Sequence, residues 1–253
     1  MKKFKGEKEE IDPKKLIRDF DSQNEKMENF FLGLGVFYND LKSLLTFEEI
    51  VKEMYEAPKK DEVSAHSGSY YGLMVYIQKM VAGTIYEFFN LIEKHNKIIE
   101  KNTEFNEIKN KLNKDEINLW EQIVDVANKK NEKASDLLRS LCIIRNKFGF
   151  HYDTYDECLR PGYVSRFFGE MKHPSNQKAY YSFGKTMTET RFFFSDASVE
   201  EALHIAMGKE PDKSSIDNIS IKKFNREVVD TIKIICPIIA TLLKHFIKYR
   251  RNL

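Results

Sequence analysis

Hydrophobic side chains recur along most of this chain at the three- and four-residue spacing of amphipathic helices. The spacing is most regular in residues 69–101, where it predicts a long helix with one apolar face. Before it, the pattern predicts a helix over residues 13–31, with Pro13 in its first turn, and another over residues 46–57, which begins with a capping box at Thr46. The dominant period is helical, so the expected fold class is mainly α.

The second half of the chain continues this pattern. Residues 102–113 are polar and are expected to form a linker, whereas residues 115–148 are expected to be helical with an interruption near residues 128–131. A long last helix is predicted over residues 221–249, with a kink at Pro237. The predicted architecture is a helical bundle with a long C-terminal helix.

Residues 153–196 differ from the rest because they are rich in glycine, proline and aromatic side chains. Within them, residues 179–184 and 190–195 have the composition of two short strands of a β-hairpin. Ser198 and the residues after it are typical of the start of a short helix. This segment is therefore expected to be an insertion on the helical bundle.

The composition supports one large globular domain. Of the 253 residues, 42% are hydrophobic, which is enough for a substantial core. We expect residues 1–12 to form a flexible tail and residues 13–253 to form a single helical domain, with residues 153–208 as the insertion that holds the hairpin and the short helix.

Charge, cysteine content and apolar runs narrow the class of protein. The 41 basic and 39 acidic residues leave a net charge of +2, so any RNA contact would have to use a local basic patch. The three cysteines show no CxxC spacing, which favours a reducing compartment and argues against disulfides or a zinc site. The longest apolar run, residues 234–243, is too short for a membrane span, and the N-terminus has no signal-like apolar region. A cytoplasmic protein without membrane contact is expected.

One helical segment places polar groups where its period calls for apolar ones. On a helical wheel of about 100° per residue, a single stripe collects Ala134, Leu137, Leu138, Leu141, Ile144 and Phe148. Arg145 lies inside this stripe, and His151 lies at its edge. Because a buried unpaired cation is costly, Arg145 must meet a carboxylate, backbone carbonyls, a phosphate-bearing ligand or a water-filled cleft.

The run from Arg145 through Asn146 to His151 resembles the signature of the HEPN superfamily, which is an arginine, a polar residue, a short spacer and a histidine near the end of a bundle helix. The long helix before the motif and the residues after it make it look most like the abortive-infection branch of that superfamily. The resemblance covers about residues 15–152 and the last helix. It implies an all-α bundle that forms a homodimer and, in active members, a metal-independent endoribonuclease in a toxin or antiphage-defence system.

The motif has the groups that RNA cleavage without a metal needs. Such cleavage requires a base for the 2′-hydroxyl, an acid for the leaving 5′-oxygen and a cation beside the phosphorane. Histidine suits the first two tasks because its unperturbed pKa of about 6.5 allows both protonation states near neutrality. One His151 cannot serve as base and acid in the same turnover, so a two-fold dimer would supply a second His151 and a second Arg145. Asn146 would position a hydroxyl or a phosphate oxygen, and no metal or cofactor is expected.

The two residues after the motif are candidates to support His151. Tyr152 follows it directly, and Asp153 could hold the imidazole in one tautomer, although an acidic group after a helix is more often part of a solvated turn. In HEPN toxins controlled by a nucleotidyltransferase partner, the modified tyrosine lies at the position of Asp153. That form of control is therefore not expected, and the kind of antitoxin or other defence partner stays open.

Cations alternate with aromatic side chains after the motif, which makes this segment the best candidate for RNA contact. The cations are Arg160, Arg166, Lys185 and Arg191. The alternative is that the aromatic side chains pack the hairpin onto the bundle while the cations keep it soluble.

The motif also has a structural explanation. Arg145 could extend to a carboxylate such as Asp136 or Glu87, and His151 could cap a helix end near Gly149. The chain would then be a catalytically silent HEPN-like module that binds RNA or protein, or a helical scaffold. The sequence has no Gly-rich phosphate loop, nucleophile elbow or HExxH motif, which disfavours nucleotide hydrolysis, serine-type catalysis and zinc proteolysis. The favoured hypothesis is an RNA-cleaving homodimer.

Overall fold

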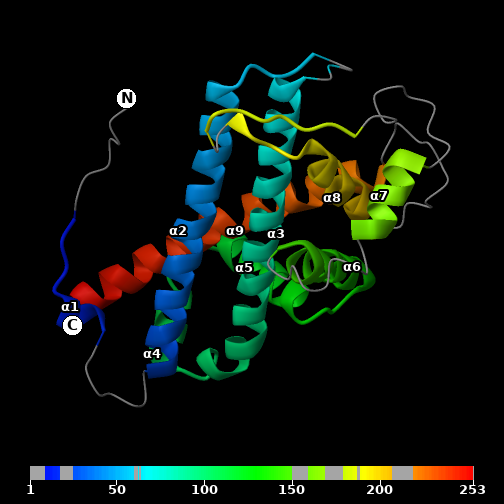
Figure 1. Cartoon of the computed structure of the whole chain (residues 1–253). Helices are drawn as coiled ribbons and strands as arrows, with labels where there is room; N and C mark the ends of the chain where they lie inside the picture. Colours follow the sequence, from blue (N-terminus) through cyan, green and yellow to red (C-terminus); the bar gives the residue numbers. More distant parts are fainter. Residues whose placement is uncertain are drawn as a thin grey trace.

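Two long helices, α2 (Glu25–Met54) and α3 (Ala65–Ile99), lie side by side and antiparallel at the centre of the molecule (Figure 1). The computed structural model describes residues 9–17, 25–59, 62, 64–149, 159–168, 179–186, 189–206 and 219–252. The apolar faces of the two helices meet, and the rings of Phe37 and Phe88 stack with their centroids 4.3 Å apart. The mainly α fold class is confirmed.

The N-terminal helices differ from the prediction. Before α2, the described residues contain only the single turn α1 (Pro13–Leu16), and α2 passes through Thr46 without a break. The helix start predicted at Thr46 is wrong because Leu41 and Val51 continue one buried face across that position, and packing keeps the chain helical. Residues 1–8 of the predicted tail lie outside the described residues.

The long helix predicted over residues 69–101 is confirmed as α3, which begins one turn earlier. Ser64 caps it: Ser64 Oγ accepts a hydrogen bond from the Ser67 N–H at 3.1 Å, and the Ser64 N–H donates to Ser67 Oγ at 3.0 Å. These reciprocal bonds satisfy donors that a helix N-terminus otherwise leaves open.

Three shorter helices connect α3 to the predicted motif. They are α4 (Thr103–Lys109), α5 (Lys114–Ala127) and α6 (Glu132–Ile143). The linker predicted over residues 102–113 is wrong, because Phe105 and Ile108 of α4 are buried in the core and order this stretch. The interruption predicted near residues 128–131 is confirmed as the turn between α5 and α6.

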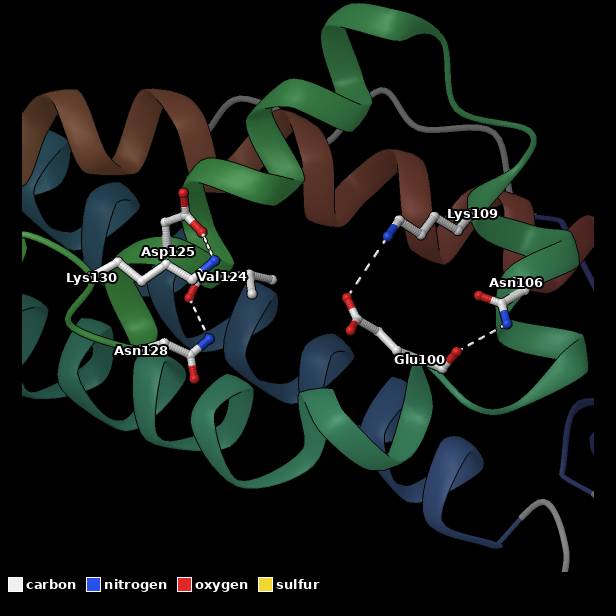
Figure 2. A network of polar contacts seen from close by, with 7 residues as sticks. All are labelled: Glu100, Asn106, Lys109, Val124, Asp125, Asn128 and Lys130. Atoms are coloured by element: carbon white, nitrogen blue, oxygen red, sulfur yellow. Dashed lines mark hydrogen bonds and ion pairs between the residues drawn. The ribbon is translucent and has the colours of Figure 1, made fainter.

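Polar contacts stabilise the turn between α3 and α4 and the turn between α5 and α6, and Figure 2 shows them. They are Asn106 Nδ2 to the Glu100 carbonyl (3.0 Å), Lys109 Nζ to Glu100 Oε1 (3.8 Å), Asn128 Nδ2 to the Val124 carbonyl (2.7 Å) and Lys130 Nζ to Asp125 Oδ1 (2.6 Å). After the second turn, Asn131 caps α6 by accepting a hydrogen bond from the Ala134 N–H at 2.8 Å. These contacts fix where α6 begins and so where the motif lies.

The C-terminal helix α9 (Ile219–Arg251) crosses behind the α2–α3 pair (Figure 1). The predicted long last helix is confirmed, and Pro237 lies inside it. Near its end the Phe246 ring stacks on Phe31 with the centroids 4.2 Å apart. None of the helices in the described part of the chain combines the length and the apolarity needed to cross a bilayer.

The described part of the insertion is mainly helical. It contains α7 (Leu159–Phe168) and α8 (Phe193–Ala206), and Figure 1 shows them side by side at one end of the bundle. The described part has no hairpin strands, only an isolated antiparallel bridge between Ser182 and Arg191. The predicted second strand fails because Phe193 is buried and the chain enters α8 there.

Candidate functional site

The predicted apolar stripe continues from α6 into a segment of a different helix type. All six of its members, Ala134, Leu137, Leu138, Leu141, Ile144 and Phe148, are buried. From Ile144 to Gly149 the chain leaves the α-helical path and forms a π-helix, labelled η1. A π-helix has a wider turn than an α-helix, so positions predicted on an α-helical wheel shift here. Arg145 is the second residue of this segment, and its side chain is 36% exposed.

Arg145 is held by two neighbours. Its Nε donates a hydrogen bond to Glu87 Oε1 on α3 at 2.9 Å, and its Nη1 donates to Asn146 Oδ1 at 2.8 Å. The contact between Arg145 and Glu87, one of the two carboxylates expected to meet it, is confirmed, whereas Asp136 lies on the wall of a different cavity. Both partners of the ion pair keep solvent contact, because the Glu87 side chain is 54% exposed.

Asn146 continues the network away from the arginine. Its Nδ2 donates to Cys142 Sγ on α6 at 3.2 Å, so one amide joins Arg145 to the thiol. Cys142 also hydrogen-bonds to Tyr86 on α3, and this bond, together with burial, raises the pKa of the Tyr86 phenol. The amide thereby orients the guanidinium, a task that the sequence did not predict for Asn146.

A cavity of about 410 Å³ opens beside this network, between α2 and α3. Its wall includes Val36 and Asp40 from α2, and Gly83 and Glu87 from α3, with Arg145 at one side. A Cβ built on Gly83 would meet only Arg145 Cγ, at 3.8 Å, so no side chain separates the arginine from α3. Arg145 therefore borders an open cavity, in line with the cleft that the sequence offered as one explanation of its position.

The predicted catalytic histidine and the two residues that could support it lie outside the described residues. This holds for His151, Tyr152 and Asp153. Within the described part of the chain, no group of three or more His, Cys, Asp or Glu side chains is placed to hold a metal ion.

The four cations predicted for RNA contact lie on different parts of the insertion. Arg160 and Lys185 are exposed, whereas Arg166 is half-buried on α7. Arg191 is also half-buried, and its Nε donates to Asp196 Oδ2 of α8 at 2.8 Å. Arg191 is thus partly engaged inside the protein, while Arg160 and Lys185 face solvent.

The sequence did not predict a role for Tyr86 or Cys142. Tyr86 lies on α3 and Cys142 on α6, and both are adjacent in sequence to the apolar positions that predicted these helices. Gly72, Lys79, Tyr86 and Asn90 recur at seven- and four-residue spacing on one face of α3, and we call this face the polar seam.

Comparisons of the chain with protein-family models, with curated proteins and with solved structures found no significant match. The function therefore has to be inferred from the side chains and their geometry.

Proposed function

We propose that this protein is a metal-independent endoribonuclease of the HEPN type that acts in a toxin or antiphage-defence system. The observation that carries the proposal is the position of Arg145 on the wall of an open cavity. Its guanidinium is oriented by Glu87 and Asn146, and no described residue accepts a hydrogen bond from its Nη2. An oriented cation with a free donor beside water is suited to bind a phosphate.

The chemistry assigns one task to each group. Arg145 stabilises the negative charge that develops on the phosphorane, and Asn146 and Glu87 keep the guanidinium in place. His151 of one subunit takes the proton of the 2′-hydroxyl, and His151 of the other subunit protonates the leaving 5′-oxygen. The site is therefore composite and requires a two-fold homodimer.

Cleavage of a labelled RNA by purified protein tests this proposal. Arg145→Ala and His151→Ala should each remove cleavage while the helical circular dichroism stays unchanged, and Arg139→Ala, an exposed arginine on α6, is the matched control. Cleavage should persist in excess EDTA and stop with a 2′-deoxy substitution at the cut site, because the nucleophile is then missing. Activity that needs a divalent metal and cuts DNA equally well contradicts the mechanism.

The ion pair between Arg145 and Glu87 favours a second candidate function, that of a catalytically silent module that binds RNA or protein. In that case the guanidinium serves only to join η1 to α3. The two candidates differ in two results. A silent module binds its partner without cleaving RNA, and Arg145→Ala then changes neither the RNA nor the growth of cells that express the protein.

A further inference from the structure

A half-buried lysine, Lys79, lies on the polar seam of α3. Lys79 is half-buried, and no residue in the described part of the chain forms an ion pair with it. Burial lowers the pKa of Lys79, and the negative charge of Asp196 acts in the opposite direction. A half-buried ammonium without a direct ion pair is costly for the fold, which suggests that it serves a ligand.

Arg191 brings a second cation to the same seam. Its Nε contacts Asp196 Oδ2 at 2.8 Å, whereas its Nη1 and Nη2 donate to no described residue. The guanidinium lies directly against α3 at Gly72, where an added Cβ would be 2.1 Å from Nη2. The glycine therefore makes room for the arginine.

The helical register of α3 places Lys79 on the same face as Gly72, against which that guanidinium lies. Gly72 and Lys79 are two helical turns apart and share one face of the helix. Side chains of a helix lean toward its N-terminus, so the Lys79 chain leans toward Gly72 and the arginine that covers it. Asp196 forms an ion pair with Arg191 and also acts on Lys79, so one carboxylate is shared between the two cations.

We propose that Lys79 and Arg191 form a phosphate-binding site that holds a backbone phosphate of the RNA next to the one that Arg145 contacts. Arginine offers two parallel N–H donors to phosphate oxygens, and lysine adds a compact charge. Lys79 lies four residues, a rise of about 6 Å, before Gly83, and Gly83 and Arg145 line the same cavity, so both sites follow the same face of α3. The identity of the ligand as RNA depends on the proposed function, whereas its phosphate chemistry does not.

The first test measures binding of an uncleavable 2′-O-methyl RNA to the full chain. Lys79→Met keeps the apolar part of the side chain and should weaken binding by about ten- to a hundredfold, the range for a hydrogen bond to a charged group. The slope of log K against log salt should fall by about 0.7, the value for one lost phosphate contact on a single strand. Lys94→Met, an exposed lysine on the same helix, is the control and should change neither quantity.

The second test uses inorganic pyrophosphate and needs no RNA. Pyrophosphate should raise the melting temperature of the parent and of Arg145→Ala, but not that of Lys79→Met or of Arg191→Met. If Lys79→Met binds RNA with the affinity and salt slope of the parent, the inference is overturned even where Arg145→Ala abolishes cleavage. If the parent binds no RNA, the proposed function fails, and the pyrophosphate measurement alone tests the phosphate site. In that case, a melting temperature of the parent that pyrophosphate does not raise overturns the phosphate site.

Discussion

Removing Arg145 and Glu87 singly and together separates a catalytic arginine from a structural one. The atoms of the pair are 2.9 Å apart, but the two side chains are 36% and 54% exposed. Solvent-exposed ion pairs contribute roughly 0.2–1 kcal/mol, because water screens the charges and both side chains lose freedom. A free energy of about 1 kcal/mol shifts the melting temperature of a chain of this size by roughly 2–4 °C. Arg145→Ala should therefore leave a folded protein that melts at most a few degrees lower.

The assay is a double-mutant cycle of Arg145→Ala and Glu87→Gln, with urea unfolding followed by circular dichroism. We expect a coupling free energy below about 1 kcal/mol, together with a loss of RNA cleavage of about 10²-fold or more for Arg145→Ala alone. The Asp230–Lys233 pair on α9, with side chains 57% and 71% exposed, is the reference for a surface ion pair. A coupling of about 3 kcal/mol, the size found for buried pairs, or an unfolded Arg145→Ala, would refute the catalytic assignment.

Two further predictions concern the packing that positions the site. Arg250→Met should lower the free energy of unfolding, measured by urea titration, by about 3–5 kcal/mol, because it removes a fully buried guanidinium from between Glu28 and Glu104. A loss below about 1 kcal/mol would mean that water reaches this cluster. Gly162→Ala should destabilise the α7–α8 pair by roughly 1–3 kcal/mol, since the new Cβ would be 2.4 Å from the Ser198 carbonyl oxygen. Hydrogen exchange in α7 and α8 measures this change. Gly35→Ala, whose Cβ would enter open space on α2, should instead stabilise the protein by about 0.5–1 kcal/mol.

The sequence predicted those helices whose order comes from a regular apolar face. Residues 69–101 carry a long regular stripe, and the stripe from Ala134 to Phe148 is buried at every member. Local signals misled where packing decided the outcome. Thr46 had the residues of a helix start, yet the buried face of α2 continues through it, and the polar stretch around α4 is ordered by only a few buried residues such as Phe105.

The candidate site was predictable in its residues more than in its geometry. The position of Arg145 among apolar neighbours indicated an unusual environment, and Glu87 was one of two carboxylates expected to meet it. Which carboxylate it meets depends on how η1 packs against α3, and the π-helix from Ile144 to Gly149 has no simple sequence signal. Lys79 escaped prediction because one lysine in an amphipathic helix ordinarily lies on its solvent face.

Two arginines of this chain show how burial separates a structural cation from one that is open to a ligand. Arg250 is inaccessible to solvent and lies between two buried carboxylates, with the Phe246 ring 5.4 Å away. Its charge is neutralised inside the protein, and a ligand could reach it only if the core opened. Arg145 has one carboxylate, which is itself half in water, and it borders a cavity. Because a phosphate could replace water there without breaking the Glu87 contact, Arg145 can gain an interaction in the bound state that Arg250 cannot, and this difference favours a functional role for the motif.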